Sequence, residues 1–142
     1  MKARRKPGII ESLAGLALLA SFPMTALAGK LNADEVKQLV SGNTHVLKEY
    51  GKEEGGRKRI RYYAPNGTFR QLNKKKTKTV KGTWSINDEG QLCNVRKDRG
   101  NCHTIYKQGN VWEAYVAKTN PMSPEKHSQT ITEVLKGNPN GL

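Results

Sequence analysis

The sequence predicts a mainly β protein: an antiparallel meander that forms a small barrel or a strongly curved sheet, preceded by one short N-terminal helix. Turn-forming residues recur along the chain at intervals that suit a strand plus its turn. Between these turns, apolar and polar residues alternate, as expected of strands with one buried face. Closure into a barrel would remove the exposed strand edges of such a meander.

Length and charge limit the class of protein further. The chain has 142 residues, of which 35% are hydrophobic and 26% are charged. This length suits one domain with a modest core, and the charged fraction excludes a polytopic membrane protein. Basic residues outnumber acidic ones by 25 to 12, a formal net charge of +13. The excess favours a partner of negative charge.

The N-terminus has the features of a cleaved signal peptide. Basic residues are followed by an apolar run from Leu13 to Phe22 and then by small residues. The run is shorter than the roughly 20 apolar residues that a membrane span needs. We therefore expect residues 1–28 to be removed between Ala28 and Gly29, which leaves one β-rich domain, 29–142, with no membrane span. The protein is then exported, either to the periplasm or out of the cell.

One segment of the remaining chain predicts a helix. Apolar residues between positions 33 and 40 fall on or near one helical face, with Asn32 or Asp34 as candidate N-cap. Gly42 follows at a position where a left-handed backbone conformation is favoured, so the helix should end there.

The later segments predict strands with a definite inner and outer face. In 79–86, the phase of Trp84 is expected to face inward, and in 111–116 the phase of Trp112. Tyr106 is also expected in the core, whereas Tyr115 is expected outside. In 59–64, the inward residues would be Ile60, Tyr62 and Ala64, and the outward ones Arg59, Arg61 and Tyr63.

The segment from Arg57 to Lys81 contains ten basic residues and no acidic residue. A hairpin through Pro65-Asn66-Gly67 would place its two halves side by side, with an exposed tyrosine among the charges. Gathering like charges is unfavourable for folding alone, so we predict an anion-binding surface; the alternative is a solvated connection between strands. The predicted surface consists of Arg57, Lys58, Arg59, Arg61, Tyr63, Arg70, Lys74, Lys75, Lys76, Lys78 and Lys81.

The two cysteines suit a structural disulfide. Cys93 and Cys102 flank a turn-forming stretch and would lie on adjacent strands of a hairpin. Redox pairs usually have the tighter Cys-x-x-Cys spacing. His103 would point to the opposite face of its strand from Cys102, which makes it a poor metal co-ligand. We expect a disulfide rather than a reactive or metal-binding pair.

Motifs of known chemistry are absent from the sequence. It contains no nucleophile elbow, zinc-protease motif or phosphate-binding loop, and the three histidines lie in different segments. We therefore expect no catalytic residue, no cofactor and no metal site, and a protein that is not an enzyme. An enzyme built from scattered residues stays as an alternative.

Several short motifs in a fixed order resemble a known family. They are Gly42-Asn43-Thr44, Tyr62 to Thr68, Gly82-Thr83-Trp84-Ser85-Ile86, the two cysteines and Gly137-Asn138-Pro139. In this order they resemble the small exported bacterial proteins of domain of unknown function 995, from about Leu31 to Leu142. The resemblance implies a lipocalin-like β-sheet and transfers no functional residue. The lysine-rich segment Lys74–Lys78 departs from the family pattern.

Three functions are compatible with these observations. The leading interpretation is an exported binding protein whose basic surface engages an anionic glycan, a phosphate-rich envelope component or an acidic protein. Export argues against nucleic acid as its physiological partner. The alternatives are a lipocalin-like carrier of a small apolar ligand and an enzyme of unrecognised class.

The signal peptide gives a first testable prediction. Protein purified from the envelope of a bacterium with two membranes should begin at Gly29, which intact-mass analysis measures directly. Retention of residues 1–28 would contradict both the export prediction and the argument for an oxidised cysteine pair.

Overall fold

A computed structural model describes residues 29–50, 55–72, 78–116 and 125–142. Eight strands of this part form a closed antiparallel barrel in which each strand pairs with the next along the chain. The last strand returns to pair with the first strand of the barrel, and a two-residue strand at the start of the described chain pairs with Tyr106 and Lys107. In order, the elements are β1 (Gly29–Lys30), α1 (Ala33–Val40), β2 (Asn43–Glu49), β3 (Arg57–Tyr63), β4 (Thr68–Leu72), β5 (Thr79–Ile86), β6 (Leu92–Arg96), β7 (Arg99–Gln108), β8 (Val111–Val116) and β9 (Lys126–Lys136).

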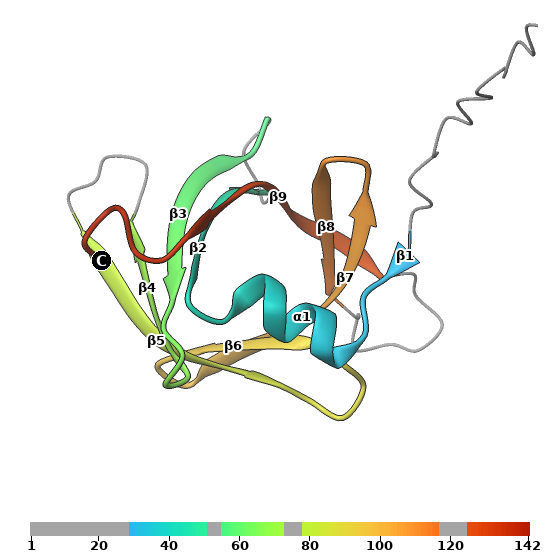
Figure 1. Ribbon diagram of the computed structural model, residues 1–142, viewed down its shortest axis with the longest axis horizontal. Helices are drawn as coiled ribbons and strands as arrows, with labels where there is room; N and C mark the ends of the chain where they lie inside the picture. Colours follow the sequence, from blue (N-terminus) through green and yellow to red (C-terminus); the bar gives the residue numbers. More distant parts are fainter. Residues whose placement is uncertain (1–28, 51–54, 73–77, 117–124) are drawn as a thin grey trace, which may run out of the picture.

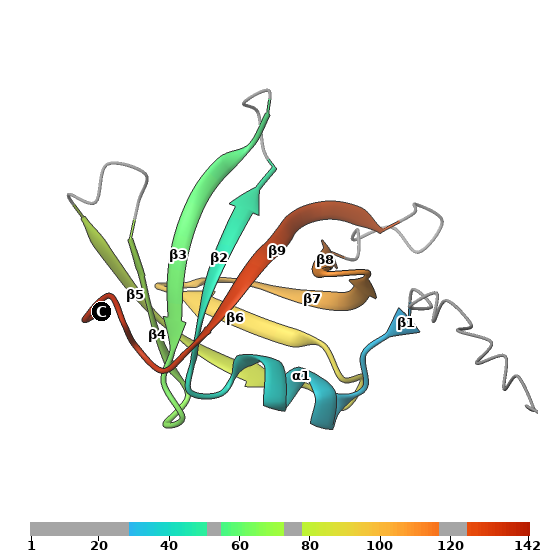
Figure 2. The same cartoon turned by 45° about the horizontal axis from the view of Figure 1, so that its top comes forward.

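The predicted fold class is confirmed. The molecule is mainly β, and its strands curve around a common axis with α1 across one end (Figure 1). A second view shows the same helix beneath the strands (Figure 2). Among the described residues, no helix is long and apolar enough to cross a membrane.

Helix α1 begins and ends where local chemistry requires. Asn32 accepts a hydrogen bond from the backbone of Glu35, whose carboxylate in turn accepts from the Asn32 N–H, forming a capping box. At the other end, the side chain of Asn43 donates to two carbonyls of the last turn, which would otherwise lack partners. Gly42 follows with a positive φ of 75°, as predicted.

The helix closes one end of the barrel and builds the core there. Val36 and Val40 are fully buried and pack against apolar side chains from five strands. Trp84 and Trp112 pack against this cluster from its edge, which confirms their predicted inward phase. The five strand residues that pack against Val36 and Val40 are Tyr63, Phe69, Leu92, Ile105 and Ala114.

Gly82 is required by the packing of an aromatic ring. It lies opposite Phe69 in the pairing of β4 with β5. A Cβ atom at this position would come within 2.5 Å of the Phe69 ring and 2.3 Å of the Val95 carbonyl oxygen. The missing side chain therefore lets the Phe69 ring pack directly against the backbone of β5.

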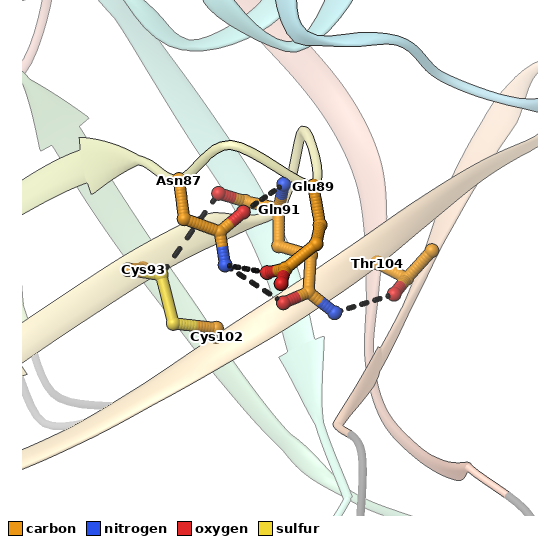
Figure 3. Close-up of a disulfide and its surroundings, with 6 residues drawn as sticks. All are labelled: Asn87, Glu89, Gln91, Cys93, Cys102 and Thr104. Carbon is orange, nitrogen blue, oxygen red and sulfur yellow. Dashed lines mark hydrogen bonds between the residues drawn. A yellow bond between two sulfur atoms is a disulfide. The ribbon is translucent and has the colours of Figure 1, made fainter.

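The predicted disulfide is present. Cys93 and Cys102 are directly opposite each other in the β6–β7 pair and are bonded. Beside them, the side chain of Asn87 accepts from the Gln91 backbone and donates to its side chain (Figure 3). Gln91 also donates to Thr104 on β7 at 3.0 Å. Covalent and polar links thus fasten the same two strands.

Removing this disulfide should lower the thermal stability. Closing so short a loop contributes about 2–3 kcal/mol, and that corresponds to a fall in Tm of about 5–15 °C in a domain of this size. The double variant Cys93→Ser/Cys102→Ser and the reduced wild-type protein should melt at the same, lowered temperature in a calorimetric scan. Equal Tm values for reduced and oxidised wild-type protein would contradict the prediction.

Candidate functional site

The half of the barrel opposite α1 contains a cavity of about 990 Å³. Its described lining comes from strands of the whole barrel and is rich in positive charge. Six basic side chains and two acidic ones contribute to it: Arg57, Arg59, Arg61, Arg96, Lys97 and Arg99, with Glu49 and Asp98. A smaller space of about 10 Å³ lies among the core residues below. The barrel is therefore packed at one end and hollow at the other.

The register of β3 explains why arginines face the cavity. Tyr63, Arg61 and Arg59 lie opposite Asn43, His45 and Leu47 of β2. Leu47 and Tyr63 are each 1% exposed, so this phase of both strands points into the barrel. The arginines continue the same phase toward the open end.

Arg61 is the most buried charge of the described wall, at 6% exposure. Its Nη2 donates to Glu49 Oε1 at 2.9 Å, its Nε to Gln71 Oε1 at 2.7 Å and its Nη1 to the Tyr63 hydroxyl at 2.9 Å. The guanidinium also lies 5.2 Å from the centroid of the Phe69 ring. A buried charge needs such a set of partners, because desolvation without them would be costly.

One carboxylate serves two arginines in this wall. Glu49 accepts from Arg61 through one oxygen and from Arg59 Nε at 3.0 Å through the other. The three side chains together carry a net charge of +1. This arrangement is sufficiently explained as a structural ion-pair network, so the inner arginines alone do not identify a binding site.

Two buried histidines lie near Arg61. The pKa of His45 is lowered to about 4, mainly by burial and also by the nearby charge of Arg61, although a hydrogen bond to the Leu39 carbonyl acts in the opposite direction. Burial, with Arg61 as the next cause, likewise lowers the pKa of His103 to about 4. Both imidazoles are therefore neutral at pH 7, and neither adds charge to the cavity.

The rim of the cavity is charged differently from the wall below. Arg96, Lys97 and Arg99 surround the β6–β7 turn and are exposed. Within the described parts of the chain, none of the three forms an ion pair. Like charges this close repel one another, and the turn brings them together at the mouth of the cavity with Asp98 as the neighbouring acid. Packing therefore gives no reason for this cluster.

The predicted basic surface is divided by the barrel wall. The predicted hairpin forms, since β3 pairs with β4. The predicted faces of β3 are wrong: Arg59, Arg61 and Tyr63 lie on its inner phase, and Ile60 shares the outer phase of the strand with Tyr62. Tyr63 is 1% exposed and packs edge-on against Trp84. The inner phase carries Arg57, Arg59 and Arg61, whereas Lys58, Arg70 and Lys81 are exposed on the outer wall and Lys78 is exposed beside β5.

Two tyrosines expected inside lie outside. Tyr62 occupies the outer phase of β3, opposite Arg70, and Tyr106 packs edge-on against Tyr115 with its hydroxyl near Glu125. Of the remaining predicted residues, Lys74, Lys75, Lys76 and Ala28, with the whole of residues 1–28, lie outside the described residues.

Several cavity residues were not predicted from the sequence. They follow the inward phase of their strands: Gln71 continues from Phe69, and Arg99, Asn101 and His103 continue from Ile105. The signal that could have found them is polar residues in phase with apolar ones along one strand. They are Glu49, Gln71, Asn94, Arg96, Lys97, Arg99, Asn101, His103 and Gln129.

Comparison of the chain with protein-family models, with curated proteins and with solved structures finds no match in any of the three. The described residues also contain no group of three or more His, Cys, Asp or Glu side chains placed to hold a metal ion. The cavity is therefore the candidate functional site.

Because of the buried histidines, the free energy of unfolding should decrease as the pH is lowered. Above pH 6.5 both imidazoles are neutral in the folded and unfolded chain. Between pH 6.5 and about 4 the unfolded chain binds protons that the folded chain excludes. Each histidine should therefore remove up to about 3 kcal/mol from the free energy of unfolding by pH 4. Urea titrations at pH 7.5, 5.5 and 4.5 measure this loss.

Two variants test whether a buried histidine causes the pH dependence of the free energy of unfolding. His103→Gln should reduce the dependence on pH, whereas His127→Gln, which removes an imidazole from the outer wall, serves as the matched control. A free energy of unfolding that does not change between pH 7.5 and 4.5 would contradict the burial of neutral histidines.

Proposed function

We propose that this protein is a binding protein that takes a small anionic ligand into the open half of its barrel. The observation that carries the proposal is the cluster of Arg96, Lys97 and Arg99 at the mouth of a cavity of about 990 Å³. This volume lies at the upper end of the roughly 300–1,000 Å³ of small-molecule sites. Guanidinium groups suit carboxylate and phosphate ligands because they donate in pairs in a fixed plane.

The lining argues against a carrier of apolar ligands. Apolar side chains are a minority of the described lining, where Phe69, Val80 and Val116 contribute. An apolar ligand would cover buried polar groups without pairing them, at a cost of about 1–3 kcal/mol for each. The barrel fold is compatible with a lipocalin-like binding protein, and the charge of the cavity favours an anion as its ligand.

The test measures how two double variants bind inorganic tripolyphosphate. One removes two basic residues from the rim of the cavity, and the other removes two from the outer wall. Wild-type protein should bind tripolyphosphate in a calorimetric titration, with an affinity that falls as salt is raised from 20 to 300 mM. Arg96→Gln/Arg99→Gln should weaken binding by about tenfold or more, because each charged hydrogen bond contributes about 1.5–3 kcal/mol.

The matched control is Arg70→Gln/Lys81→Gln, which removes the same charge from the outer wall, where the two residues are opposite each other on β4 and β5. This variant should bind as the wild-type protein does. The proposal is wrong if tripolyphosphate does not bind, or if the outer pair weakens binding and the rim pair does not.

A further inference from the structure

The cavity changes in character from its rim to its floor. At the rim, Arg96, Lys97 and Arg99 are exposed and charged. At the floor lie polar side chains that are themselves more than nine-tenths buried. These are Arg61, Gln71 and His103, each 6% exposed, and Gln129, 8% exposed.

The charge of the floor is largely compensated within the protein. Glu49 pairs with both Arg59 and Arg61, and Gln71 accepts from Arg61. Gln129 is hydrogen bonded to the Nε2 of His103 at 2.9 Å, and this imidazole is neutral at pH 7 because burial lowers its pKa to about 4. The floor therefore offers mainly neutral hydrogen-bonding groups beside a network of net charge +1, whereas the three basic side chains of the rim have a single acidic neighbour, Asp98.

Part of this hydrogen-bonding capacity has no partner among the residues that the structure describes. Both amide atoms of Asn94 are buried without a hydrogen bond to the described residues, and the Asn94 side chain lines the cavity. Unpaired buried groups of this kind are uncommon in folded proteins and call for an explanation. A ligand that carries several hydroxyl groups supplies both donors and acceptors to such a surface.

From this gradient we infer that the ligand is an acidic saccharide. Its hydroxylated ring lies on the floor beside Gln71, Asn94 and Gln129, and its carboxylate or phosphate lies at the rim beside Arg96 and Arg99. The volume of about 990 Å³ accommodates more than one sugar ring. Phe69 and Val80 give the C–H faces of a ring an apolar contact. This inference rests on the proposed function and names the chemical class of its ligand.

Matched ligand pairs separate the role of the sugar from the role of the charge. Glucose 6-phosphate is compared with inorganic phosphate, and glucuronate with acetate, by calorimetric titration at low salt. In each pair the hydroxylated ring should strengthen binding by about tenfold or more, because a site built to hydrogen bond hydroxyl groups discriminates against ligands that lack them. Laurate, which adds an apolar chain to acetate, should bring no such gain.

Two variants locate the effect on the floor. Gln129→Leu should abolish the gain from the sugar ring while leaving the affinity for inorganic phosphate unchanged. Arg96→Gln/Arg99→Gln should weaken all the anions alike. If Gln129→Leu does not fold, Asn94→Leu is used in its place, because it removes another amide of the proposed sugar contact without breaking a hydrogen bond to the described residues.

The outcomes distinguish this inference from the proposed function. If tripolyphosphate binds but the sugar ring brings no gain, or laurate brings the larger one, the acidic saccharide is excluded and anion binding stands. If no anion binds, including tripolyphosphate, both proposals are wrong.

Discussion

The guanidinium of Arg61 lies where the packed half of the barrel meets the hollow half, and the arrangement of both halves depends on it. A charge this deeply buried must be fully hydrogen bonded. Its partners come from three neighbouring strands: Glu49 from β2, Tyr63 from β3 and Gln71 from β4. Below this level the side chains are apolar and close-packed against α1. Above it they are polar and surround open space.

This ion-pair network also determines what the cavity can bind. Glu49 compensates much of the charge of the inner arginines, so the lower wall carries hydrogen-bonding groups with little net charge. The same positive field and the same burial keep His45 and His103 neutral. The unpaired positive charge is left to the β6–β7 turn at the mouth. A ligand thus meets charge first and neutral polar groups afterwards, an order that suits a molecule with one anionic end.

Stability and binding are concentrated in different parts of the barrel. The capping box of α1, the apolar cluster beneath Arg61 and the Cys93–Cys102 bond strengthen the closed end and the wall of β6 and β7. Arg96, Lys97 and Arg99 contribute charge where packing gains nothing from it. A cluster of residues that does not favour folding commonly marks a functional site, and these three residues cluster at the mouth of the cavity.

The sequence by itself determined the class of fold, the helix with its caps and the disulfide. Each of these follows from local chemistry: turn residues between alternating segments, a cap at Asn32 or Asp34 (Asn32 in the structure) with Gly42 after the helix, and two cysteines flanking a short turn. Only the tertiary structure decided which phase of β3 faces inward. In 59–64 one phase holds Ile60, Tyr62 and Ala64 and the other holds two arginines, so alternation favoured the wrong phase as the inner one. The pairing of Tyr63, Arg61 and Arg59 with β2, and of Arg61 with Glu49, made the choice. It turned three arginines of an expected outer basic surface, Arg57, Arg59 and Arg61, into the lining of a cavity, because closing the barrel brings together side chains that are far apart in the sequence.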